Sequence, residues 1–172
     1  MPHEERHALD VLERIELHAV VMRGQASRRL VRHFGLGYGY ESHELVATDP
    51  LPAELEWLHE RCAALAEVAP DELAQILVTR YPAGAPIGWH RDAPSFGRVV
   101  GVSLASACRM RFQRGSGEKR RVWELELEPR SAYVLRGSAR WSWQHSIPPT
   151  KAERYSLTFR TLRNRPAAAR AG

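Results

Sequence analysis

The sequence predicts a mostly β protein whose helices are confined to the N-terminal part and whose strands form a sandwich or jelly roll. Strand-length runs recur at short intervals in the second half of the chain, and turn-forming residues separate them. This spacing is typical of all-β architectures. A chain of 172 residues buries roughly 70% of the surface that its unfolded form exposes. We therefore expect a single domain over residues 1–172 that needs no metal to fold.

The N-terminal part is expected to contain a short strand and an amphipathic helix. The strand covers His18–Gly24, where apolar residues end at a glycine. The helix covers Pro52–Glu67, with proline where a first helical turn tolerates it. Its apolar positions follow the helical repeat: Leu55, Leu58, Cys62 and Leu65. We expect Trp57 and His59 on this helix to be structural.

Strand signals dominate from Leu73 onward. A β-rich stretch runs to Tyr81 and breaks at Pro82–Pro86. Further strands are predicted over Arg98–Leu104, Arg109–Gln113, Arg121–Leu127, Ser131–Leu135 and Arg154–Arg160. The tail from Arg163 to Gly172 is expected to be a frayed terminus.

Composition indicates an ordinary soluble protein with a basic surface. Hydrophobic residues make up 44% and charged residues 26%, and no run suits a signal peptide or a membrane span. We expect a cytoplasmic monomer without membrane contact. Cys62 and Cys108 are the only cysteines and are expected to be reduced and buried. The net charge of +5 and the pI of about 9.7 modestly favour polyanionic partners.

A basic segment followed by aromatic residues lies near the N-terminus. Four basic side chains precede three aromatic rings that are separated by glycines: Arg28, Arg29, Arg32 and His33, then Phe34, Tyr38 and Tyr40. On a flexible loop, this combination suits a polyanion with unstacked bases. The alternative is a glycine-rich hairpin whose rings pack on the body of the protein.

A candidate metal site combines His90, Asp92 and the distant His145. Side chains two positions apart share a face in an extended segment, and a jelly roll can bring His145 beside them. Two imidazoles and one carboxylate are the ligands of a facial-triad Fe(II) site, which leaves positions open for substrate and oxygen. On spacing alone, the alternative is that these three residues occur together by chance. For the strand Arg154–Arg160, described next, the alternative is an exposed charged strand.

The predicted strand Arg154–Arg160 carries polar residues on alternate positions. One face holds Arg154, Ser156, Thr158 and Arg160. If this face lines the interior, its arginines could bind a small dicarboxylate through bidentate hydrogen bonds. The two arginine Cα atoms lie roughly 20 Å apart in an extended strand, so both reach one diacid only if they lean together. We expect Arg154 at the distal carboxylate and Arg160 nearer the metal.

The chain resembles the AlkB family of Fe(II)/2-oxoglutarate dioxygenases from about Ile15 to Arg163. Four runs match in order and spacing: Leu77–Asp92, Val102–Leu104, His145–Ile147 and Arg154–Arg160. The resemblance implies a double-stranded β-helix (jelly roll) over about residues 74–163, a nucleotide-recognition lid over about 25–45 and a tail at 164–172.

The resemblance also implies roles for individual residues. His90, Asp92 and His145 would bind Fe(II), while Tyr81, Arg154 and Arg160 would contact 2-oxoglutarate. Thr79 and Ser156 stand where the best-known bacterial member has asparagines, and both can still hydrogen-bond the co-substrate. Residues expected near the nucleic-acid substrate are Arg28, Arg29, Phe34, Tyr38, Tyr40 and Trp89.

The implied activity is oxidative demethylation of N-alkylated bases in single-stranded DNA or RNA, as in the repair of DNA alkylation damage. Molecular oxygen and 2-oxoglutarate would be consumed, and succinate, CO2 and formaldehyde released. Ala93 and Pro94 follow Asp92, so the acidic residue that some members use to read the base is missing. The identity of the alkylated base therefore does not carry over from the family.

Three alternatives to this reading stay open. A related dioxygenase could act on a protein or a small molecule. The same three metal ligands could bind zinc or another metal without redox chemistry. The chain could also be a non-catalytic nucleic-acid-binding module.

Overall fold

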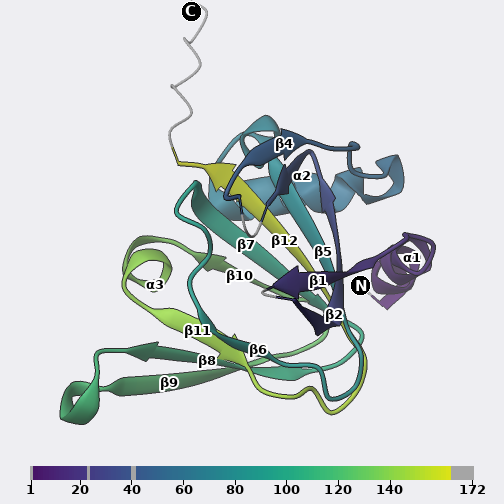
Figure 1. Cartoon of the computed structure of the whole chain (residues 1–172). Helices are drawn as coiled ribbons and strands as arrows, with labels where there is room; N and C mark the ends of the chain where they lie inside the picture. The colour runs from purple at the N-terminus through teal and green to yellow at the C-terminus, as the bar shows by residue number, and fades with distance from the viewer. Residues whose placement is uncertain (1, 23, 40–41, 164–172) are drawn as a thin grey trace, which may run out of the picture.

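Two antiparallel sheets face each other in the computed structural model, which describes residues 2–22, 24–39 and 42–163. The larger sheet contains, in spatial order, β1 (His18–Met22), β2 (Gln25–Phe34), β5 (Gln75–Tyr81), β12 (Arg154–Leu162), β7 (Phe96–Leu104) and β10 (Ser131–Leu135). The smaller sheet contains β6 (Ile87–His90), β11 (Gln144–Ile147), β8 (Cys108–Arg114) and β9 (Arg121–Leu127). Figure 1 shows the smaller sheet below the larger one, with the β8–β9 hairpin projecting from it.

Shorter elements connect and cover the sheets. A separate two-stranded hairpin is formed by β3 (Leu36–Tyr38) and β4 (Leu45–Ala47). The α-helices are α1 (Pro2–Leu12), α2 (Glu56–Ala66) and α3 (Gly137–Trp141), and 3-10 turns cover Ala53–Leu55, Pro70–Glu72 and Gly117–Lys119. No helix within the described residues has the length and apolar character needed to cross a membrane.

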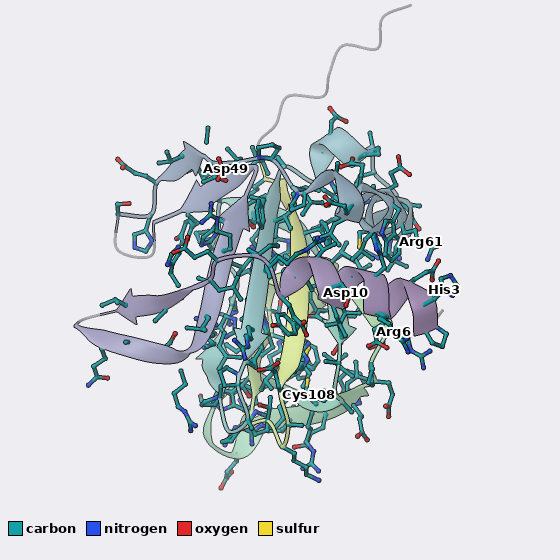
Figure 2. The ribbon with its side chains drawn as sticks, turned by 90° about the vertical axis from the view of Figure 1, so that its right-hand side faces the viewer. His3, Arg6, Asp10, Asp49, Arg61 and Cys108 are labelled. Atoms are coloured by element: carbon teal, nitrogen blue, oxygen red, sulfur yellow. The ribbon has the colours of Figure 1, made fainter. Side chains whose placement is uncertain are left out.

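The outer face of the larger sheet is covered by α1 and α2. Leu12 of α1, Cys62 of α2 and Phe159 of β12 belong to one buried cluster. Figure 2 shows α1 lying across the sheet, with its His3 end near Arg61 of α2. The two helices are joined there by an ion pair of 2.8 Å between Arg61 and Glu4. This helical layer leaves the opposite face of the sheet to the second sheet.

A second buried cluster lies between the two sheets. It includes Tyr81 and Val99 of the larger sheet and Met110, Phe112 and Ile147 of the smaller one. On β12, alternate residues therefore serve different layers. Tyr155, Leu157 and Phe159 share one face, as alternation predicts, and they pack under the helices. The intervening polar residues of β12 face the smaller sheet.

The jelly-roll prediction is confirmed, and so are its principal elements. The strand at His18–Gly24 is β1, the helix at Pro52–Glu67 comprises a 3-10 turn and α2, and the later strands appear as β5, β7, β8, β9, β10 and β12. Cys62 and Cys108 are free and buried, as expected. The predicted tail beyond Arg163 lies outside the described residues.

Two local expectations are wrong. Leu65 is 46% exposed, because the buried face of α2 turns toward the sheet through Ala63 and Ala66 instead. The basic segment Arg28–His33 is not on a loop, because it belongs to β2, which pairs with β5 in the larger sheet from Leu30 onward. The expectation that helices are confined to the N-terminal part also fails at α3 (Gly137–Trp141), a short helix among the later strands.

Candidate active site

The two histidines of the predicted triad lie opposite each other on paired strands. His90 is the last residue of β6, and its register partner on β11 is His145. Their ring centroids are 4.3 Å apart. Asp92 follows β6 directly, and one ligand atom from each of the three residues lies within 4.8 Å of the others. The pairing of β6 with β11 thus brings His145 next to His90, although the two residues are far apart in the sequence.

His90 is neutral and presents one ring nitrogen to the triad. Its Nδ1 lies 2.8 Å from the carbonyl oxygen of Gly88. Because a carbonyl only accepts, Nδ1 carries the proton in this hydrogen bond and Nε2 keeps a free lone pair. Burial and the neighbouring His145 lower the pKa of His90 to about 4. A neutral imidazole held in one tautomer is what a divalent metal requires.

Asp92 is held as a carboxylate by Arg160. Burial alone would raise the pKa of Asp92, but the charge of Arg160 and the hydrogen bond with His145 outweigh it and bring the pKa well below its usual range. Arg160 Nε donates to Asp92 Oδ2 at 2.6 Å, while Oδ1 lies 3.4 Å from His145 Nε2. Arg160 also donates to Gln75 Oε1 at 2.8 Å. Arg160 therefore orients one carboxylate oxygen away from the metal position and leaves the other facing it.

Arg154 is a buried cation with unused hydrogen-bond donors. The residue is 0% exposed, and its Nε donates to Ser103 Oγ at 2.9 Å. Its Nη1 and Nη2 are buried and have no hydrogen-bond partner among the described residues. Buried charges are normally paired, and two parallel N–H groups match a carboxylate. This end of the site therefore fits a carboxylate of 2-oxoglutarate.

The strand register explains how one small diacid fits between the two ends. Ser103 is the register partner of Ser156, so the Arg154 side chain leans from its own position toward the triad. Thr79 pairs with Ser156 on the neighbouring strand, and both are buried. Tyr81 pairs with Arg154, whose Cζ lies 5.3 Å from the Tyr81 ring centroid. Arg160 instead contacts Asp92, which divides the two arginines between the ends of the site.

Three further residues at the site were not foreseen from the sequence. Gln75 is 0% exposed and contacts Arg160; strand alternation with Thr79 and Tyr81 could have indicated its position. Tyr133 lies against Gly101, where an added Cβ would be 2.2 Å from Tyr133 Cζ. Burial raises the pKa of Tyr133 well above its usual range, so its phenol stays neutral.

The third is Arg140 of α3, which fixes the loop that follows Asp92. This residue is only 3% exposed. Its guanidinium donates to the carbonyl oxygens of Ala93, Phe96 and Gly97 at 2.7, 2.7 and 2.9 Å. Burial lowers the pKa of Arg140, although the nearby Asp92 carboxylate opposes that shift. The local sequence does not predict this role, because the hydrogen bonds join Arg140 to a loop more than 40 residues earlier in the chain.

The residues expected to contact nucleic acid do not form one cluster, unlike those expected to bind the metal and 2-oxoglutarate. Arg28 donates to the carbonyl oxygens of Gly84 and Ala83 at 3.0 and 3.3 Å, which ties β2 to the loop before β6. The positive charge of Arg29 contributes slightly to the lowered pKa of His90. Phe34 is 5% exposed and belongs to the core beneath the helices, so its ring is not offered to a base.

The expected aromatic residues also differ in their surroundings. Tyr38 packs on Phe96 with ring centroids 5.7 Å apart. The Trp89 ring lies under the guanidinium groups of Arg111 and Arg120, at 5.0 and 6.0 Å. Since successive side chains of a strand face opposite ways, Trp89 points away from the His90 ring. Tyr40 lies outside the described residues.

Comparison with known proteins agrees with this geometry. A family model described as the 2OG-Fe(II) oxygenase superfamily matches residues 6–161. The solved structure of OsALKBH1 has the same fold, with a TM-score of 0.64 at 16% identity over 93% of this chain and 90% of that one.

Curated relatives match in sequence. The mouse tRNA (carboxymethyluridine(34)-5-O)-methyltransferase ALKBH8 is 32% identical over 72% of this chain, and the Arabidopsis thaliana alkylated DNA repair protein ALKBH8 homolog is 29% identical over 84%. The uncharacterized protein L905 of Acanthamoeba polyphaga mimivirus is 31% identical over 51%. The chain spans only 19%, 52% and 48% of these relatives' own lengths, respectively. The chain therefore belongs to the 2OG-Fe(II) oxygenase superfamily, whose members use Fe(II) and 2-oxoglutarate, and its sequence relatives include proteins of the AlkB type.

Proposed function

We propose that this enzyme oxidatively removes alkyl groups from the nitrogen atoms of bases in single-stranded DNA or RNA, in the manner of alkylation-damage repair. The observation that carries the proposal is the His90–Asp92–His145 triad together with the buried Arg154, whose two terminal nitrogens have no partner among the described residues. Two relatives support a nucleic-acid substrate through their names, one for tRNA and one for alkylated DNA. The basic balance of the chain, with a net charge of +5, suits the same partner.

Each residue of the site has a distinct task in this proposal. His90 Nε2, Asp92 Oδ1 and His145 would hold the iron. Arg154 would bind the distal carboxylate of 2-oxoglutarate, with Tyr81, Thr79 and Ser156 bordering the co-substrate. Arg160 would keep Asp92 ionised and correctly turned, because its Nε donates to the oxygen that does not face His145.

When bound, Fe(II) and 2-oxoglutarate would activate molecular oxygen, so that one oxygen atom enters succinate as 2-oxoglutarate loses CO2 and the other hydroxylates the alkyl carbon. A hydroxylated methyl group then leaves as formaldehyde, and the base nitrogen keeps the proton. The protein's part is positioning and the exclusion of water around buried polar groups. The target base must leave its stack to reach a site between two sheets, which suits single strands and weakly paired, damaged bases.

The proposal is tested by turnover on defined oligonucleotides. The iron-loaded protein is incubated with 2-oxoglutarate, oxygen and single strands that contain 1-methyladenine or 3-methylcytosine, as DNA and as RNA. Formaldehyde release together with restoration of the unmodified base is expected. Peptides and methylated free nucleosides serve as parallel substrates, and turnover of these alone would indicate a protein or small-molecule hydroxylase instead.

A further inference from the structure

The smaller sheet carries a row of four rings that leads from the triad to the protein surface. Strand register places His90, His145, Phe112 and Trp123 opposite one another across β6, β11, β8 and β9. Successive ring centroids are 4.3, 6.3 and 5.5 Å apart. His145 and Phe112 are buried, whereas Trp123 is 56% exposed. The row therefore ends in an aromatic ring offered to solvent on the edge strand, roughly 14 Å from His90 by strand spacing.

Unpaired cations lie on the turn side of this exposed ring. Arg114 and Arg121 are register partners one same-face step beyond Phe112 and Trp123, and Lys119 lies in the turn between them. All three are exposed, and no carboxylate in the described part of the chain pairs with them. Other surface arginines do find acidic partners, such as Arg109 with Glu124 on the same hairpin at 3.6 Å. Glu118 lies in the same turn, but the cations outnumber it, so the hairpin tip is net positive: Arg114, Lys119, Arg120 and Arg121.

Side-chain contacts join the tip to β6 and β11, the two strands that carry the triad histidines. Arg120 lies 6.0 Å from the Trp89 ring and donates to Gln113 Oε1 at 3.0 Å. Gln113 in turn donates to Gln144 Oε1 at 2.8 Å, and Gln144 precedes the triad residue His145. The tip also lies at the end of the smaller sheet where β6 ends and Asp92 follows. Figure 1 shows the hairpin projecting from the body of the protein at this end.

We propose that the tip of the β8–β9 hairpin binds the single strand that carries the target base, with a neighbouring base stacked on Trp123 and phosphates on Arg114, Lys119 and Arg121. This inference rests on the proposed action on nucleic acid. A flat exposed ring beside several unpaired cations is the combination that binds single strands without regard to sequence. An acidic peptide would satisfy the charges but has no need of the ring, and the ring belongs to the row that contains the triad histidines.

The test measures the affinity of the full-length protein for an unmodified single-stranded oligonucleotide of about 15 nucleotides, so that it does not depend on turnover. Trp123→Ala is expected to weaken binding roughly tenfold, the effect of losing one stacked base. Val122→Ala is the matched control, because Val122 is 50% exposed on the opposite face of the same strand. It is expected to bind like the wild type.

A second pair of variants tests the charges and does not touch the core. Arg121→Gln is expected to reduce the slope of log affinity against log salt by about 0.7, the value for one phosphate contact on a single strand. Arg109→Gln, whose native side chain is already paired with Glu124, is expected to keep the wild-type slope.

The two proposals can fail separately. If Trp123→Ala and Arg121→Gln bind no worse than their controls, the hairpin assignment is overturned even when the enzyme demethylates oligonucleotides. Competition by a polyglutamate peptide that equals competition by an oligonucleotide would also overturn it. If the variants behave as expected but no methylated strand is turned over, the docking surface stands and the proposed reaction falls.

Discussion

Arg160 donates its Nε–H to Asp92 Oδ2 at 2.6 Å, while Asp92 Oδ1 faces His145 Nε2 at 3.4 Å. One carboxylate oxygen is thus occupied by a cation and the other is left for the metal position. A residue that hydrogen-bonds a metal ligand typically contributes a factor of roughly 10 to 100 to the metal affinity.

Arg160→Gln is expected to weaken binding of Fe(II), or of Mn(II) as an air-stable substitute, by about that factor. The reason is that Asp92 loses the charge that opposes the effect of burial on its pKa. Arg160→Lys serves as the control, because it keeps the positive charge but loses the several N–H donors of the guanidinium. Its metal affinity should lie between those of the wild type and Arg160→Gln. Metal titration of the purified proteins gives the answer, and equal affinity in all three would show that Arg160 does not support Asp92.

The local part of this site was predictable, whereas its long-range part was not. His90 and Asp92 could be placed together because residues two apart in an extended segment share a face. The pairing of His145 with His90 depends on the register between β6 and β11, which no local pattern encodes. For that reason, the spacing alone could not distinguish the triad from chance.

The same limit explains the remaining differences. Alternation correctly divided the two faces of β12, but the lean of Arg154 toward the triad depends on Ser103 of another strand. Phe34 looked like part of an aromatic loop because its neighbours are glycine and basic residues, yet β2 pairs with β5 and buries it. Tyr133 and Arg140 act across strands and loops that only the folded chain brings together.

The buried charge of Arg154 should destabilise the protein when 2-oxoglutarate is absent. When 2-oxoglutarate is present, Arg154 should bind it. Replacing a buried, incompletely paired charge by an apolar residue of similar length is often neutral or stabilising. Arg154→Met is therefore expected to have an unchanged or higher Tm without ligand.

The same substitution should raise the KM for 2-oxoglutarate by roughly 100-fold or more, since two charge-assisted hydrogen bonds are lost. Wild-type protein should gain about 2.7 kcal/mol of stability at a co-substrate concentration 100 times Kd. Steady-state turnover at varied 2-oxoglutarate concentration measures the KM, and thermal melting with and without 2-oxoglutarate measures the gain in stability. A variant that still gains the wild-type increment would contradict the role of Arg154.

Gly101 is expected to be intolerant of any side chain. A Cβ there would approach Tyr133 Cζ to 2.2 Å, so Gly101→Ala must displace the ring and should cost about 1 to 3 kcal/mol of unfolding free energy. Gly88→Ala is the matched control, because nothing lies within 4 Å of its added Cβ, and it should change stability by less than about 0.5 kcal/mol. Denaturant unfolding compares them, and equal losses would mean that the contact with Tyr133 is not responsible.

His33 should make the protein less stable in acid. Burial and the positive charge of Arg160 lower the pKa of His33 from 6.5 to about 4. As the pH falls below about 6.5, His33 takes up a proton in the unfolded chain but not yet in the folded protein. The free energy of unfolding therefore decreases between about pH 6.5 and 4.

The expected slope from this histidine is at most about 1 kcal/mol per pH unit, since the ring is partly exposed to solvent. His33→Gln should flatten the profile in this window. Unfolding free energies measured between pH 4 and 7 on metal-free protein decide the matter, and parallel profiles for wild type and variant would refute the assignment.

The most direct measurement of the central claim is the stoichiometry of products from a single strand that contains 3-methylcytosine. We expect the iron-loaded wild type to release formaldehyde and succinate in equal amounts while restoring cytosine, and His145→Ala and Asp92→Asn to release neither. A folded, iron-loaded wild type that forms no formaldehyde from methylated DNA or RNA, or variants that retain full turnover, would contradict it.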